Sequence, residues 1–461
     1  MSPLRAISFS LVVLVAACAS AGDPTPEAAP SLQSMPAAFA SAPAEQQAPQ
    51  TDWWRGFADP TLDRLVDQAL SSNRDLLAAE AEVRRARAIA SIEGWRLLPS
   101  GGVSAAGGRV RDINPVVESD FAEAGADISW EIDVFGRLRH GARAAGREAL
   151  SVEEARRGVR VTIAAETAIA YATLRGAQAR LAAARSNAEA QQQTLVRIEA
   201  LREAGRGNPF DVARARELYE TTAAQVAAIE GEVSAARNAL DVLVMGVPSD
   251  IDLNASGPVP TPPRQFGVGA PEDLLQRRPD IRRARAVLEA ATARTQAARV
   301  DWWPRLSLFG LASWTGADLQ SVGDSDGFSF VLGPRIDWPA LDFRRNALRT
   351  EAARANAEAE FYRYDQIVYA AVRDVETSLA GLDAASRSAE GLTRAAEAAG
   401  EASRISRLRY QEGMESFFSV LDAQRRAAEA EDRLAVARTR RAVAYIRLGQ
   451  ALGAGWSETS Q

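Results

Sequence analysis

The sequence has no lysine, one cysteine (Cys18) and one histidine (His140) among its 461 residues. These counts exclude Cys/His zinc sites, Cys–His nucleophile pairs and disulfide scaffolds. A Ser–His–Asp arrangement would have to use His140, which stands among three arginines. The chain also lacks a glycine-rich phosphate loop and a nucleophile elbow. The sequence therefore predicts a protein that is not an enzyme and that carries no cofactor or metal.

The chain has a net charge of −6, because it contains 54 basic residues, all arginine, and 60 acidic residues. Nucleic-acid phosphates select a basic face, so this balance argues against a nucleic-acid partner. Apolar residues make up 47% and charged residues 25%, which is typical of folded rather than disordered chains.

The N-terminus has the pattern of an export signal. One positive charge at Arg5 precedes an apolar run over 6–15 that is too short to span a bilayer. The run ends in Ala-Ala-Cys at Cys18, which resembles the cleavage box of bacterial lipoproteins. We therefore expect Cys18 to become the first residue and to carry several acyl chains, which anchor far better than one. The alternative is an ordinary signal peptide with an incidental cysteine.

Residues 19–50 are rich in Ala, Pro, Ser and Gln and have no hydrophobic period. Such a segment cannot bury enough surface to offset ordering, so we expect a tether or an extended wrap. No later stretch reaches eighteen uninterrupted apolar residues, and the mature chain is predicted to lack a transmembrane helix.

The remaining chain contains an internal repeat. The matches that carry most weight are Pro99 with Pro304 after a shift of 205 residues, and Trp130 with Trp338, Phe135 with Phe343, Gly205 with Gly413 and Phe210 with Phe418 after a shift of 208. The predicted segments are a signal peptide (1–17), a lipidated linker (18–50), a first repeat (51–246), a Pro/Gly-rich linker (247–271), a second repeat (272–452) and a C-terminal tail (453–461).

Each repeat reads as a helix, a strand pair, a very long helix, a tight turn and a return helix. The first helix is predicted over about 60–98, with Asp59 as N-cap and Pro60 at the first helical position. No proline interrupts 116–208 or 340–461, and proline inside a helix costs ~3 kcal/mol. The long helices would therefore run over 141–204 and 345–412 and measure ~95 and ~100 Å.

Apolar residues on two of the helices step by three and four, over 226–243 and 368–382, as in the seams of coiled coils. One chain cannot bury such rods, so we expect these seams to pack against coiled-coil partners; an ordinary core stripe is the alternative.

The strand pairs are predicted over 101–110 and 122–135, and over 305–314 and 327–341, with polar loops at 111–121 and 315–326. Strands of about ten residues span a membrane when tilted, and aromatic residues cluster near their ends. A soluble sandwich is the alternative. Four strands cannot close a barrel and open edges are not tolerated in hydrocarbon, so in a membrane several chains would have to contribute.

Several stretches resemble the TolC-like outer-membrane efflux proteins, specifically the lipoprotein factors of tripartite efflux systems (NodT type). The residues that carry the resemblance are Trp53-Trp54, Phe57-x-Asp59-Pro60-x-Leu62, Ala69-Leu70-x-x-Asn73-x-Asp75-Leu76, Trp130-x-x-Asp133-x-Phe135-Gly136-Arg137, Arg277-Arg278-Pro279-Asp280-Ile281, Trp338-Pro339-x-x-Asp342-Phe343, Arg409-Tyr410-x-x-Gly413 and Leu421-Asp422-Ala423-Gln424-Arg425. They cover nearly the whole chain, from Cys18 to about Leu452.

The resemblance implies a mainly α-helical chain with a small membrane β part. It implies a homotrimer in which four strands per chain form a 12-stranded barrel that continues as an α-helical tunnel through the periplasm. The implied function is that of a passive conduit for drugs or other small molecules. A periplasmic adaptor and an inner-membrane RND-type pump would be its partners, and Cys18 would anchor it in outer-membrane lipid.

The resemblance also implies functional positions. The turns at Gly205 and Gly413 would form the periplasmic tip that contacts the adaptor, and glycine there permits left-handed backbone. Family members close this tip with an apolar ring and an aspartate ring, which match Phe418 and Asp422, and Arg425 can pair with Asp422. The family more often has an aliphatic residue at position 418. The alternatives are plain turn chemistry and a solvated Asp–Arg pair.

Two other classes of protein compete. A periplasmic coiled-coil lipoprotein scaffold or adaptor without a channel would share the rods, but adaptors have one hairpin flanked by β-rich domains. An enzyme would need reactive groups, and paired carboxylates such as Glu153 and Glu154 are expected on an exposed helix face as solvated charges.

Overall fold

A computed structural model describes residues 25–40, 50–113, 116–255, 257–263, 266–318 and 322–456. The predicted signal peptide, Cys18 and much of the predicted linker lie outside these residues. No helix in the described part of the chain is both long and apolar enough to cross a bilayer. The chain divides into two compact units.

The two units cut across the sequence repeats. One contains Met1–Gln33, Ala86–Leu150 and Ala284–Asp365, and the other contains Ser34–Arg85, Ser151–Arg283 and Gln366–Gln461. Each unit therefore combines equivalent parts of both repeats, and each is described by itself below.

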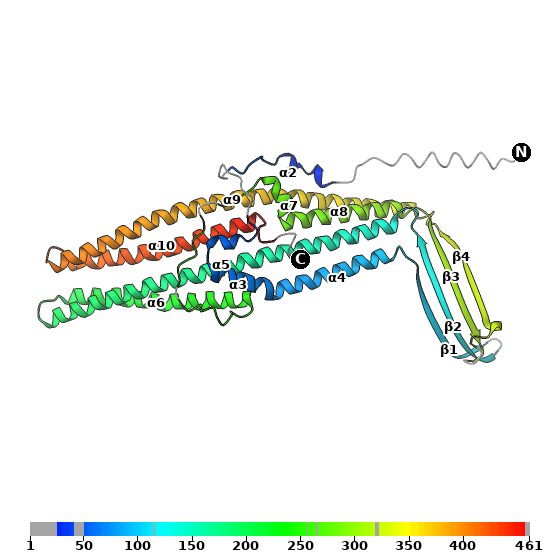
Figure 1. Ribbon diagram of the computed structural model, residues 1–461, viewed down its shortest axis with the longest axis horizontal. Coiled ribbons are helices and arrows are strands. Elements are labelled where there is room, and N and C mark those ends of the chain that lie inside the picture. The colour runs from blue at the N-terminus through cyan, green and yellow to red at the C-terminus, as the bar shows by residue number, and fades with distance from the viewer. Residues whose placement is uncertain are drawn as a thin grey trace. The chain divides into compact units, whose positions relative to one another are not determined.

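The first unit contains a four-stranded antiparallel sheet in the order β1-β2-β3-β4 (Figure 1). Its strands are β1 (Ser100–Ile113), β2 (Val116–Ile132), β3 (Arg305–Gly316) and β4 (Phe328–Asp337). Strands β1 and β4 are its two edges, and each is paired on one side only. The predicted number of strands is confirmed.

Several strand boundaries differ from the prediction. Strands β1 and β2 continue into the expected loop at 111–121, because charges of opposite sign face each other across the ladder. The Nε atom of Arg109 lies 2.7 Å from a carboxylate oxygen of Asp120, and Arg111 pairs with Glu118 one step further on. Strand β4 ends at Asp337, before Pro339, rather than at 341.

The remaining chain is largely helical. The helices are α2 (Pro30–Gln33), α3 (Pro60–Ser72), α4 (Arg74–Trp95), α5 (Arg137–Glu203), α6 (Pro209–Val244), α7 (Leu274–Arg277), α8 (Pro279–Val300), α9 (Phe343–Gln411) and α10 (Phe417–Ala451), with short 3₁₀ turns η2 (Pro26–Ala28), η3 (Trp53–Phe57), η4 (Pro271–Asp273) and η5 (Ser325–Gly327). Helices α5 and α9 have 67 and 69 residues, so the two uninterrupted rods are confirmed.

The predicted first helix is two helices, because the chain breaks at Asn73. Asp59 caps α3 as expected, and its Oδ1 accepts from the N–H of Thr61 at 2.9 Å. At Asn73 the backbone turns extended, and the buried side chain accepts from the N–H of Asp75 at 2.9 Å and donates to the carbonyl of Leu243 at 3.0 Å. The side chain of Asn73 thus forms a hydrogen bond with a backbone N–H that the break leaves without a helical partner.

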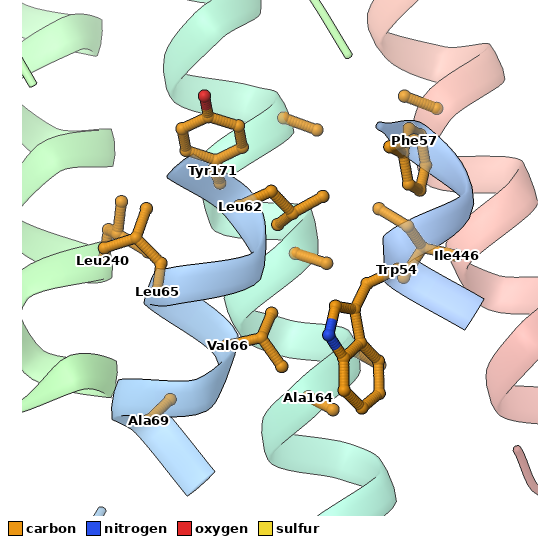
Figure 2. Packing of buried hydrophobic residues seen from close by; sticks show 14 of the residues in the cluster. Trp54, Phe57, Leu62, Leu65, Val66, Ala69, Ala164, Tyr171, Leu240 and Ile446 are labelled. Carbon is orange, nitrogen blue, oxygen red and sulfur yellow. The ribbon is translucent and has the colours of Figure 1, made fainter. Parts of the chain in front are cut away.

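The core of the second unit forms where η3 and α3 pack against α5, α6 and α10 (Figure 2). Trp53 and Trp54 are each 1% exposed and meet edge to face. The hydroxyl of Tyr171 on α5 donates to Asp59 at 2.9 Å, so the capping residue of α3 also ties it to the long helix. The seam residues of α6 and α9 are buried or half-buried along their lengths, as the heptads predict.

Glu154 was expected on an exposed face, and this expectation is wrong. Its side chain is 1% exposed and pairs with Arg157 and with Arg282, the latter at 2.9 Å. Both guanidinium groups lie over the ring of Trp456, at 4.6 and 4.9 Å from its centroid. The first residues of the predicted tail therefore belong to the fold, because Trp456 also donates to the carbonyl of Arg277 at 2.9 Å.

Candidate functional site at the turns of the helical hairpins

The turns that join α5 to α6 and α9 to α10 have the same backbone. Gly205 and Gly413 adopt φ of 72° and 75°, the left-handed region that glycine alone enters without strain. The equivalent hydrogen bonds are Gly205 N–H to Arg202 carbonyl (2.9 Å) and Arg206 N–H to Leu201 carbonyl (2.9 Å) in the first turn, and Gly413 N–H to Tyr410 carbonyl (3.0 Å) and Met414 N–H to Arg409 carbonyl (2.9 Å) in the second. This is the Schellman pattern of helix ends.

Each return helix begins with a capping side chain at equivalent positions. Asn208 Oδ1 accepts from the N–H of Phe210 at 3.0 Å, and Ser416 Oγ accepts from the N–H of Ser419 at 3.3 Å. Both turns are exposed. The structure thus places Gly205 and Gly413 as the sequence predicts, at two surface turns of matching geometry.

Beneath the turns, an apolar cluster joins the two hairpins. Its buried members come from α5, α6 and α10: Leu195, Ile198, Val212, Ala215, Phe417 and Leu421. Tyr410 on α9 packs on Phe417, with ring centroids 5.5 Å apart. Because all four helices contribute, the two hairpins meet at this end as one packed group.

Phe418 has a cationic partner from the other hairpin. Cζ of Arg214 on α6 lies 4.4 Å from the centroid of the Phe418 ring and 5.4 Å from that of Phe210. Both rings are otherwise exposed, by 52% and 61%. Such cation–π contacts contribute ~0.5–1 kcal/mol at exposed sites. The stack Phe210–Arg214–Phe418 therefore links α6 to α10 beside the turns.

Asp422 is held by its own helix. Its carboxylate accepts from Arg425 at 2.9 Å and lies 2.8 Å from Nε of Arg426. Arg425 also donates to Glu429 at 2.6 Å, so it links two carboxylates along α10. The hydrogen bond from Arg425 lowers the pKa of Asp422 below its usual range. The pairing expected for Asp422 and Arg425 is present, within one helix.

Sequence reasoning missed Arg214, although the repeat contains a signal for it. The shift of 208 residues places Arg214 on Asp422 and Glu217 on Arg425. The two return helices thus have opposite charges at both equivalent positions, on the same backbone. The repeat search weighed identities, so it could not register a reversal of sign.

A polar cleft of about 370 Å³ opens beside this cluster, lined by α5, α6 and α10. Arg425 and Glu217 lie at its walls together with Arg180, which donates to Asp432 at 2.7 Å and also pairs with Glu232. Groups of three or more His, Cys, Asp or Glu side chains arranged to hold a metal ion do not occur among the described residues. The site offers alternating charges and exposed rings.

The repeated helical hairpins and the four-stranded sheet are features of one protein family. The chain is a member of the outer membrane efflux protein family, whose model matches residues 65–245 and 270–454. The two matched stretches correspond to the two repeats, and the fold class and the outer-membrane efflux function expected from the resemblance are confirmed.

Individual relatives agree with this assignment. The chain is 30% identical to outer membrane protein OprJ of Pseudomonas aeruginosa over 474 residues, which cover 99% of this chain and 97% of OprJ. It is also 30% identical to probable outer membrane lipoprotein SilC of Salmonella typhimurium over 477 residues, 99% of this chain and all of SilC. The solved structure of the outer-membrane channel OprN matches with a TM-score of 0.83 and 33% identity, over 92% of this chain and 97% of OprN.

Proposed function

We propose that three copies of this chain form a passive conduit across the outer membrane, through which small molecules leave the cell. The observation that carries the proposal is the sheet with two open edges. Strands β1 and β4 are paired on one side only, and an unpaired edge is not tolerated in hydrocarbon. Edge-to-edge pairing between copies satisfies them, and three chains give a barrel of twelve strands.

The strands themselves support membrane insertion. They have 10 to 17 residues, enough to cross a bilayer when tilted. The strands carry large apolar side chains that the single chain leaves exposed, such as Val103 (90% exposed), Phe330 (75%) and Ile336 (71%). Exposed apolar surface on this scale needs a cover, and lipid supplies it.

The helical hairpins would continue the conduit into the periplasm. Their turns at Gly205 and Gly413 are exposed and suit contact with a periplasmic adaptor, which would link this protein to an RND-type pump of the inner membrane. The pump would supply the energy, since a conduit needs only a water-filled lumen and a gate.

The gate would lie where α10 begins. Phe418, Asp422 and Arg425 stand within two turns of this helix, and three copies around an axis would bring three carboxylates and three rings together. The cation–π contact of Arg214 would also fix the Phe418 ring from the neighbouring hairpin. The ion pairs and the cation–π stack would keep the closed tip in place until a partner pulls the hairpins apart.

Cys18 would anchor the chain in outer-membrane lipid through its acyl chains. The box at Ala-Ala-Cys supports this role, Ala19 fits the sorting of lipoproteins to the outer membrane, and the relative SilC is named an outer membrane lipoprotein. Mass spectrometry of the N-terminal peptide before and after Cys18→Ser tests it.

Reconstitution tests the conduit. The processed chain, purified in mild detergent, should have three times the mass of its own protomer and should form conducting channels in planar bilayers. Phe330→Arg should strongly reduce insertion, because an arginine on the lipid face costs up to ~2–4 kcal/mol, whereas Phe330→Leu should conduct normally. A protein that stays monomeric in buffer without detergent would instead be the scaffold or adaptor without a channel.

A further inference from the structure

All four connections between helices and strands of the first unit lie at the same end of the four strands. The register places Ser100 beside Ser129, Ile132 beside Leu306 and Arg305 beside Asp337, so β1 and β3 start where β2 and β4 end. We call the residues at these connections the junction collar: 95–99, 133–145, 299–305 and 338–349.

The junction collar is strongly basic in an acidic chain. It contains nine arginines and three aspartates, whereas the whole chain has a net charge of −6. The arginines are Arg96, Arg137, Arg139, Arg143, Arg299, Arg305, Arg344, Arg345 and Arg349, and the aspartates are Asp133, Asp301 and Asp342. Arginine is therefore concentrated at the end of the sheet where the strands join the helices.

Acidic residues in or beside the junction collar pair with four of these arginines: Arg96 with Glu93, Arg137 with Glu131, Arg139 with Asp133 and Arg345 with Asp342. Asp301 lies 2.7 Å from Arg305 and 3.9 Å from both Arg137 and Arg349, so one carboxylate faces three guanidinium groups. Arg143 and Arg344 are exposed and form no ion pair within the described part of the chain. At least these two side chains are available to an external anion.

Helix polarity also favours anions at the junction collar. Helices α5 and α9 both begin in the junction collar, and neither has an acidic residue in its first turn. By contrast, α3 and α6 have Asp63 and Asp211 there. An aspartate precedes each start: Asp133 accepts from the N–H groups of Leu138 and Arg139 at 3.1 and 2.9 Å, and Asp342 pairs with Arg345 at 3.2 Å. Arginines near a helix N-terminus oppose the helix dipole, so the two arginines outside these pairs, Arg143 and Arg344, gain from a further anion nearby.

Apolar side chains share the same surface. Trp95 is 69% exposed, Trp338 52%, Phe343 65% and Leu341 94%. A separate pocket of about 210 Å³ has Arg96, Arg137 and Arg349 on its lining, together with the carboxylates of Glu93 and Asp301. Free phosphate needs no apolar neighbours, whereas a phospholipid presents a phosphate beside hydrocarbon, and aromatic residues with arginine suit that interface.

We propose that the junction collar binds the headgroups of anionic phospholipids, with Arg143 and Arg344 as phosphate ligands. The proposal rests on the proposed membrane insertion of the sheet, since it requires the collar to stand at a bilayer surface. Guanidinium groups bind phosphate with two parallel hydrogen bonds, which explains the fit of arginine here. The collar would thus fix how deep the sheet sits.

Lipid competition tests this. The full-length oligomer is reconstituted in phosphatidylcholine, and phosphatidylglycerol or phosphatidylcholine with brominated acyl chains is added to quench tryptophan fluorescence. Wild type should prefer phosphatidylglycerol. Arg143→Gln with Arg344→Gln should reduce the preference by up to ~30-fold at low salt, about fivefold per arginine. Arg197→Gln with Arg394→Gln, exposed arginines elsewhere on α5 and α9, should leave it unchanged.

Three results would overturn the proposal: equal affinity of wild type for both lipids, equal loss in the control pair, or full competition by inorganic phosphate, which would make the collar a site for the free anion. Channel conductance in phosphatidylcholine separates this failure from failure of the conduit. Conductance without lipid preference rejects the collar alone, and absence of conductance in every bilayer rejects the conduit.

Discussion

At the scale of single residues, Asp422 and Arg425 are the testable parts of the proposed gate. If their ion pair helps to hold the tip closed, Asp422→Ala and Arg425→Ala should each raise the single-channel conductance of the reconstituted protein. The control is Asp383→Ala, which breaks an exposed ion pair with Arg387 (2.8 Å) in the middle of α9. Unchanged conductance in both gate variants, or an equal rise in the control, would contradict the assignment.

The pH dependence of the gate follows from the lowered pKa of Asp422. Arg425 stabilises the ionised carboxylate, so the pair contributes fully above the ordinary carboxyl pKa of 3.8 and is lost only as pH falls below it, through the lowered pKa. Conductance should therefore stay constant from neutral pH down to that value and rise beneath it. Asp422→Asn should remove the acid step, and a step near pH 6 would point to another group.

Arg214 gives a separate prediction, because it holds Phe418 without touching Asp422. Arg214→Gln should remove both cation–π contacts and favour the open tip by ~0.5–1 kcal/mol, about two- to fivefold in open probability. Arg216→Gln is the matched control, since Arg216 pairs with Glu199 at 2.7 Å instead of with a ring. Equal open probabilities in wild type and Arg214→Gln would show that the stack is incidental.

At the scale of elements, Asn73 is the joint between α3 and α4. Asn73→Ala should destabilise the protein by ~1–2 kcal/mol, because it removes a cap and leaves the carbonyl of the half-buried Leu243 without its side-chain donor. Thermal unfolding of the assembled protein should show a lower Tm, and Asn73→Ser, which restores a cap, should recover part of it. An unchanged Tm in Asn73→Ala would contradict this account.

The same joint shows where sequence reasoning succeeds and where it fails. The rods and turns were predictable, because missing prolines and the glycines at 205 and 413 are local signals. The break at Asn73 was not, since it depends on a carbonyl 170 residues away. The burial of Glu154 beside Arg282 and the contact of Arg214 with Phe418 are likewise made by residues far apart in the chain.

At the scale of the whole molecule, the C-terminal segment connects the two repeats. Trp456 lies against Arg157 of the first repeat and Arg282 of the second. Trp456→Ala should destabilise the protein by ~2 kcal/mol, less than the ~3–5 kcal/mol of a fully buried tryptophan. A Tm measured in detergent should fall in this variant and be largely retained in Trp456→Phe. Equal melting of wild type and Trp456→Ala would mean that the segment is dispensable.

The reversed charges of the two return helices bear on how the duplication is used. The backbone, the caps and the aromatic positions coincide at both turns. If the two turns were also identical in charge, a docking protein would find two equivalent binding positions. The first repeat has Arg214 and Glu217 where the second repeat has Asp422 and Arg425, so the two positions differ in charge. In the proposed trimer the two kinds of turn would alternate, so a docking partner would meet two chemically different positions although the three subunits are identical.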